Sequence, residues 1–182
     1  MTGNNEIALP TSGLAEDILA RFMDSAQQDI DRRQHDEIRV EAVVHHLVTF
    51  KLGVEEYGVE IGSVQEIIRA ADITPVPGAP IHIRGVINLR GKIIPVVDMR
   101  VRFTLPGGEE SDQRRIVVVE AEGKRLGMLV DSVSQVVKIP AGIVEEIPEE
   151  ATSAAENFIK GVGKLDGRLV IILDLNRSLL LT

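Results

Sequence analysis

The sequence contains no cysteine and no tryptophan, and it has only one tyrosine and four phenylalanines in 182 residues. The absence of cysteine excludes disulfide frameworks, thiolate metal sites and thiol nucleophiles. No apolar run approaches the roughly 18 residues that cross a bilayer. The N-terminal stretch MTGNNEIALPTSG also lacks the basic and apolar regions of a secretory signal. We therefore expect a cytoplasmic protein without direct membrane insertion.

Valine, isoleucine and leucine dominate the apolar residues, and this β-branched bias favours strands over helices. The net charge of −8 is not that of a nucleic-acid-binding protein. One local basic group, with no aromatic residues between its members on which bases could stack, consists of Arg84, Arg90, Lys92, Arg100 and Arg102. Nucleic acid is therefore not an expected partner.

Residues 1–44 form an extension that differs from the rest of the chain. Nine acidic and four basic residues lie there, which gives −5 of the total charge of −8. Apolar residues recur every four positions, at Leu14, Ile18, Phe22, Ala26 and Ile30. This spacing predicts an amphipathic helix over about 13–37, with Ser12 as its cap. The apolar face either docks on the globular part or stays loosely ordered, or it contacts a partner.

From His46 onward the pattern changes to strands and tight turns. Four hairpins are predicted, and a short helix is expected at the end, over about 175–181. The paired strands are His46–Leu52 with Tyr57–Ile61, Ile83–Leu89 with Lys92–Asp98, Arg114–Ala121 with Lys124–Val130, and Phe158–Leu165 with Arg168–Leu173.

An internal repeat is the most informative feature of the sequence. IRGVINLRGKIIPVVDM (83–99) aligns without gaps with IKGVGKLDGRLVIILDL (159–175) at an offset of 76. YGVEIGSVQEII (57–68) aligns with LGMLVDSVSQVV (126–137) at an offset of 69. Two such matches in the same order indicate two similar halves, with lobes at about 46–104 and 112–175. Few helices separate the strands, so antiparallel sheets curled into small barrels are expected.

No catalytic, cofactor or metal site is evident, and an enzyme is not expected. GVINLRGKI does not match a phosphate-binding loop, because its glycines are one residue too far apart and Ile93 replaces the Ser or Thr that ligates magnesium. His45 and His46 are adjacent, so in a strand they point to opposite faces. Asp98 and Asp174 each follow a strand and precede a helical turn, which suits helix N-caps better than catalytic acids.

A surface for partners remains as the candidate site. Val64, Ile67 and Ile68 have helical spacing after a strand, and their repeat equivalents are Val133, Val136 and Val137. These residues are either plain core or the walls of a groove between the lobes that receives a partner helix. Arg90 stands at a hairpin tip where the second half has Asp166, so it is either a solvated side chain or a contact residue.

At these residues the sequence resembles the CheW family of chemotaxis coupling proteins. The resemblance runs from about Leu47 to Leu181. It rests on five motifs in order: EEYGVEIGSVQEI, TPVPGAP, RGVINLRGKIIPVVDMR, GMLVDSVSQVV and GRLVIILDL. Two features depart from the family pattern: Met99 replaces the usual Leu, and the extension is longer than the usual tail. The extension raises the possibility of a paralogue that serves a different chemosensory array.

The resemblance implies two SH3-like five-stranded barrels side by side and a non-enzymatic adaptor role in membrane-associated receptor arrays. The implied partners are the cytoplasmic tip of a methyl-accepting chemoreceptor and the regulatory domain of the histidine kinase CheA. Matched by motif, the receptor-binding residues would be Val64, Glu66, Ile67, Arg90, Val133 and Val136. No kinase-binding residue can be transferred in this way. A small-ligand sensor that uses the cleft between the lobes is the remaining alternative.

Overall fold

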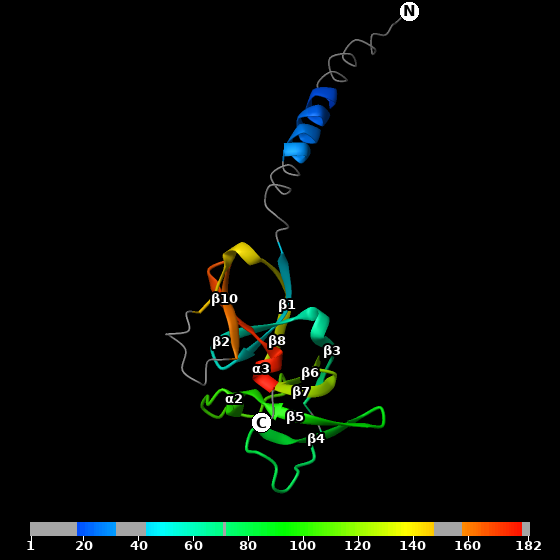
Figure 1. The fold of residues 1–182 in the computed structure, drawn as a ribbon, viewed down its shortest axis with the longest axis vertical. Helices are drawn as coiled ribbons and strands as arrows, with labels where there is room; N and C mark the ends of the chain where they lie inside the picture. The colour runs from blue at the N-terminus through cyan, green and yellow to red at the C-terminus, as the bar shows by residue number, and fades with distance from the viewer. Residues whose placement is uncertain (1–17, 32–42, 71, 148–157, 180–182) are drawn as a thin grey trace, which may run out of the picture. The chain divides into compact units, whose positions relative to one another are not determined.

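The computed structural model describes residues 18–31, 43–70, 72–147 and 158–179 (Figure 1). The chain divides into two compact units, Met1–Ala42 and Val43–Thr182. In the first unit, residues 18–31 form a helix in which every side chain except that of Ala26 is exposed. This agrees with the predicted helix, while Ser12 and the two ends of the expected range lie outside the described residues. No described helix has the length and apolar character needed to cross a membrane.

The second unit is mainly β, as expected from its composition. Its strands are β1 (Val44–Leu52), β2 (Glu55–Glu60), β3 (Val64–Arg69), β4 (Ile83–Leu89), β5 (Lys92–Asp98), β6 (Arg115–Ala121), β7 (Lys124–Val130), β8 (Ser132–Pro140), β9 (Val144–Glu145), β10 (Ile159–Leu165) and β11 (Arg168–Leu173). The helical elements are η1 (Ile61–Ser63), α2 (Met99–Arg102), η2 (Ala141–Ile143) and α3 (Leu175–Leu179). The four predicted hairpins are confirmed within two residues at each end, and α3 confirms the closing helix as far as it is described.

The strands form two sheets. Sheet A has the order β8-β1-β2-β11-β10-β9, and sheet B has the order β3-β6-β7-β5-β4. Neighbouring strands are antiparallel except for two parallel pairs, β2 with β11 and β5 with β7. In Figure 1, β10 of sheet A and β4 of sheet B lie at opposite ends of the unit. The predicted class, mainly β with two small β subdomains and short helices, is confirmed, and sheet A contains six strands where five were expected.

The two halves of the sequence exchange strands, which differs from the contiguous lobes expected at 46–104 and 112–175. Sheet A joins β1 and β2 to strands of the second half, and sheet B joins β6 and β7 to strands of the first half. The repeat offsets pair β1, β2, β3, β4 and β5 with β6, β7, β8, β10 and β11, so the two sheet orders are equivalent under this exchange. Four strand pairs join the two halves: the parallel pairs β2–β11 and β5–β7, and the antiparallel pairs β1–β8 and β3–β6.

Three hydrophobic clusters fill the unit. Ile116 and Val118 on β6 belong to a cluster on one face of sheet B, and Leu47 with Val170 belongs to a separate cluster on sheet A. Val117 and Val119 point from the other face of β6 into a larger central cluster, which also contains residues of sheet A. The alternation along β6 follows the two-residue period of a strand. Each sheet therefore has its own small core, and a shared core joins them.

A row of aromatic side chains crosses the central region. The rings of Phe50 and Tyr57 stack at 5.9 Å, those of Tyr57 and Phe103 stack at 5.6 Å, and Phe103 reaches Phe158 at 5.7 Å. Arg102 lies over the Phe158 ring at 4.5 Å and donates from Nε to the carbonyl of Ser178 at 2.8 Å. These contacts join α2 to α3, which are equivalent elements of the two halves.

Asp131 ties the end of β7 to the β1–β2 turn. Its Oδ2 accepts the backbone N–H of Gly53 at 2.7 Å, and its own N–H donates to Lys51 at 3.1 Å. Arg100 of α2 pairs with both carboxylate oxygens of Asp131, with Nε to Oδ1 at 2.8 Å. The hydrogen bond from Arg100, assisted by that from Gly53, lowers the pKa of Asp131 against the opposing effect of burial. The pair of Arg100 and Asp131, here called the Asp131 clamp, therefore connects the end of β7 in sheet B to the β1–β2 turn in sheet A.

We expect Asp131→Asn to lower the free energy of unfolding at pH 7 by about 1 kcal/mol. Because the pKa of the native carboxyl is lowered, its contribution is complete above the unfolded value of about 3.9 and is lost as pH falls through the native value. Urea denaturation between pH 7 and pH 3 should show the difference from the wild type shrinking in acid. The matched control is Asp112→Asn, at an exposed side chain. A difference that stays constant with pH would contradict the assignment.

Glycine at position 85 allows a close approach of two backbones. A Cβ there would lie 2.3 Å from the carbonyl oxygen of Thr74, which forms a β-bridge with Val86. At its repeat equivalent, Gly161, an added Cβ would lie 3.0 Å from the carbonyl oxygen of Glu145 in β9. The conserved spacing of these glycines in the repeat therefore reflects packing.

Gly85→Ala should destabilise the protein by about 2 kcal/mol or more, because Thr74 backbone has to move. Gly142→Ala is the control, since a Cβ at that position meets nothing within 4 Å. Thermal unfolding followed by circular dichroism measures both variants. Equal melting temperatures for the two would show that the backbone contact is not tight.

Candidate functional site

The candidate residues from the sequence lie on two edge strands and one hairpin tip. Val64, Glu66 and Ile67 lie on β3, and Val133 and Val136 lie on β8. Within the part of the chain that the structure describes, β3 pairs with β6 alone and β8 pairs with β1 alone. The helical spacing assigned to VQEII is therefore wrong, because the segment is a strand whose exposure alternates with a period of two. A short apolar segment such as this one is compatible with both the helical and the strand period, and its pairing with the β-branched strand β6 selects the strand.

Each of these edge strands carries an irregularity at the same place in the repeat. In β3 the register shifts between Val64 and Glu66, so Gln65 is the extra residue. In β8 the register shifts between Val133 and Val136 opposite β1. Bulges of this kind redirect side chains and disturb the free edge for further strand pairing. The two edges are therefore better suited to side-chain contacts than to the addition of a strand.

Thr49 of β1 stabilises the irregularity in β8. This fully buried residue donates its hydroxyl to the carbonyl of Gln135 at 3.1 Å and accepts the Gln135 N–H at 3.3 Å. The side chain thus replaces the ladder hydrogen bonds that the bulge removes. The sequence motifs did not indicate a role for Thr49. The only signal was a Thr within an apolar strand, which marks a buried hydroxyl that needs a partner.

The apolar candidates divide into inner and outer positions. Val64 and Val133, which are equivalent in the repeat, both pack against the central cluster between the sheets. Ile67 and Val136 remain exposed, at 42% and 56%. β-Branched side chains with this exposure offer apolar contact at no cost to the core. The edges of β3 and β8 therefore present a partly buried valine and an exposed apolar residue each.

Arg90 and Glu66 form an ion pair that the sequence did not predict. Arg90 Nη1 lies 2.9 Å from Glu66 Oε2, and the two side chains are 81% and 22% exposed. Arg90 and Gly91 form the β4–β5 turn with φ values of 52° and 82°, and the Gly91 N–H donates to Asn88 Oδ1 at 3.0 Å. Both positive φ values belong to the type I′ hairpin turn. The turn thus holds the guanidinium beside β3.

The apolar and charged side chains of this arrangement are suited to contact with a partner. The described residues contain no group of three or more His, Asp or Glu side chains that could hold a metal ion. The candidate N-cap Asp98 accepts the N–H groups of Arg100 and Val101 at 3.1 and 3.3 Å, and Asp174 accepts that of Arg177 at 3.2 Å. These two carboxylates therefore serve as helix caps, as expected.

Comparisons with known proteins give a consistent result. The model of the CheW-like domain matches residues 46–180. The chain is 38% identical to chemotaxis protein CheW of Klebsiella aerogenes over 140 residues, which cover 76% of this chain and 84% of the relative. It is 33% identical to protein FrzA of Myxococcus xanthus over 133 residues, which cover 72% and 82% of the two chains.

A solved structure shares both fold and sequence. The crystal structure of scaffolding protein TtCheW from Thermoanaerobacter tengcongensis aligns with a TM-score of 0.69 and 37% identity, over 75% of this chain and 88% of that chain. The protein is thus a mainly β protein with short helices, in which two sheets are built from strands of both halves. It belongs to the CheW-like domain family, which confirms the family indicated by the sequence motifs.

The Glu66–Arg90 pair should contribute between 0 and about 1 kcal/mol to stability, since exposed ion pairs are weak. A double-mutant cycle with Glu66→Gln and Arg90→Gln, measured by urea denaturation, gives the coupling free energy. Arg125→Gln with Glu120→Gln is the matched control, because that pair is separated by 4.0 Å and exposed on both sides. A coupling free energy well above about 1 kcal/mol would contradict this prediction and show that the pair is important for the stability of the fold.

Proposed function

We propose that this protein is a non-enzymatic adaptor of a chemosensory array. In this proposal it couples the cytoplasmic tip of a methyl-accepting chemoreceptor to the regulatory domain of the histidine kinase CheA. Membership of the CheW-like domain family and identity to proteins named chemotaxis protein CheW support the chemotaxis role. The solved relative is described as a scaffolding protein, which supports an adaptor without catalysis.

The observation that carries the receptor assignment is the matched pair of edge strands. Val64 on β3 and Val133 on β8 pack against one central cluster, although the strands belong to different sheets. Ile67 and Val136 add exposed apolar surface, and Arg90 with Glu66 adds charge beside β3. A receptor helix with apolar residues at i, i+3 or i+4 and polar flanks has complementary chemistry. Valines and Ile67 would supply the apolar contact, and the charged pair would set the register.

Other parts of the proposal rest on the family alone. The kinase would bind a surface for which no residue is assigned, and association with receptors would place the protein at the cytoplasmic side of the membrane. No cofactor or metal is required for this role. The alternative function within the same family is that of a paralogue that serves a different chemosensory array. The 33% identity to protein FrzA is compatible with this alternative, because that relative does not carry the name CheW.

Val136→Asp and Ile67→Asp should each weaken binding of a receptor cytoplasmic-tip fragment at least about tenfold, because a carboxylate would be desolvated at an apolar contact. Both side chains are exposed, so the melting temperature should change little. Affinity is measured by calorimetry with the full chain. Val54→Asp, at a fully exposed valine of the β1–β2 turn, is the control. Unchanged affinity in both test variants would remove the receptor assignment from β3 and β8.

A pull-down with the receptor fragment and a CheA regulatory domain tests the adaptor role itself. The wild type should retain both partners together, and Arg90→Glu should lose the receptor while it keeps the kinase domain. A chain without residues 1–44 shows whether the extension takes part. Capture of neither partner by the folded wild type would reject the adaptor proposal.

A further inference from the structure

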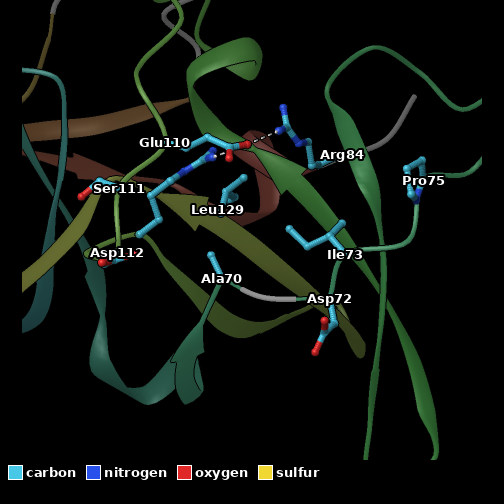
Figure 2. A pocket seen from close by; sticks show the side chains of 10 residues that line it. Ala70, Asp72, Ile73, Pro75, Arg84, Glu110, Ser111, Asp112 and Leu129 are labelled. Atoms are coloured by element: carbon cyan, nitrogen blue, oxygen red, sulfur yellow. Dashed lines mark hydrogen bonds and ion pairs between the residues drawn. The ribbon is translucent and has the colours of Figure 1, made fainter.

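A polar pocket of about 450 Å³ lies on sheet B, and none of the candidate receptor residues lines it (Figure 2). Its apolar lining residues include Ala70, which directly follows β3, Ile73, and Leu129 of β7. Ile73 and Ala70 pack against the cluster of sheet B to which Leu129 belongs. The pocket therefore has a firm base in the core of the sheet. A volume of this size accommodates a small molecule or one or two side chains.

Two arginines converge at one side of the pocket. Arg84 of β4 is 46% exposed, and Arg114, which precedes β6, is only 17% exposed. The two guanidinium groups share one oxygen, Oε1 of Glu110, at 3.5 Å from Arg84 and 4.0 Å from Arg114. Arg84 is otherwise 3.7 Å from Asp98. Strong charge-assisted contacts between such groups measure about 2.7–2.9 Å, so both arginines are paired loosely.

Glu110 is a weakly held occupant of this site. Its side chain is 83% exposed, and it follows Gly107 and Gly108 in the connection between α2 and β6. Figure 2 shows Glu110 directed toward Arg84, with Asp112 beside Ser111 and Asp72 below Ile73 in this view. The Glu110 carboxylate thus makes only long contacts with the two guanidinium groups, and its side chain is mostly exposed to solvent. Another carboxylate can take its place at little cost.

We propose that this pocket is a binding site for a carboxylate group attached to an apolar body, and that Glu110 is its built-in competitor. Arg84 and Arg114 would pair with the incoming carboxylate, and the apolar part would lie over Ile73 and Leu129. A tethered side chain competes at a high effective concentration, so its removal strengthens the binding of an external group. The group could belong to a free small carboxylate or to an acidic side chain of a protein partner. The site shares no residue with the proposed receptor contact.

The test uses the full chain and two probes, glutarate and the capped peptide acetyl-Leu-Glu-Leu-amide, followed by amide chemical shifts around Arg84 and Arg114. Glu110→Gln should bind a probe about fivefold more tightly than the wild type, which is the factor that a weak competing ion pair supplies. Arg84→Gln in the Glu110→Gln background should abolish the gain. Binding of the peptide alone indicates a protein partner, and binding of glutarate alone indicates a free carboxylate.

Glu109→Gln is the matched control, because it removes the same charge from the neighbouring residue, which is not part of the pocket lining. Dimethyl glutarate, which lacks the charge, is the control for the probe. An equal gain in Glu109→Gln would show a net-charge effect and overturn the proposal. Equal binding of dimethyl glutarate, or no binding of either probe to folded Glu110→Gln at about 20 mM, well above the millimolar range expected of weak single-site ligands, would also overturn it.

Discussion

The exchange of strands between the two halves is the constraint on which the rest of the structure depends. The parallel pairs β2–β11 and β5–β7 join strands from different halves, so neither half contains a complete sheet. β6 shows the consequence for packing, because its side chains alternate between the cluster of sheet B and the central cluster. A strand buried on both faces is apolar along its buried length, and Ile116–Val119 meets that demand. The halves therefore fold as one unit.

The same exchange determines where the candidate site lies. Because β1 pairs with β8 and β6 pairs with β3, the two equivalent strands become edges of different sheets and still adjoin one central cluster. An exposed edge invites unwanted strand pairing. The bulges at Gln65 and next to Gln135, the latter held by Thr49, disturb both edges. Protection of the edges and the direction of the candidate side chains thus depend on the same irregularity.

Charge in this acidic protein acts locally. The Asp131 clamp is well paired and partly buried, and Glu56, which is buried, pairs with Arg168 at 3.1 Å across the parallel joint of sheet A. In the pairs Arg90–Glu66 and Arg84–Glu110 the arginine side chains are exposed, which leaves the guanidinium groups of Arg90 and Arg84 accessible. In the partly buried pairs of Asp131 and Glu56, the attraction between the two charges offsets the cost of removing them from water. These pairs therefore fix the position of the elements that they join. Exposed pairs contribute little to stability and can be exchanged for contacts with another molecule.

The sequence by itself determined the family, the mainly β class, the hairpins and the caps Asp98 and Asp174, because these depend on local patterns that the repeat shows twice. It could not decide that VQEII is a strand, since a short apolar segment fits either period until β6 pairs with it. The joining of Glu66 to Arg90, and of Arg84 to Arg114 through Glu110, needs segments that are distant along the chain. Only the tertiary structure decided which half supplies each strand, because hydrogen bonding between strands is not encoded by any single segment.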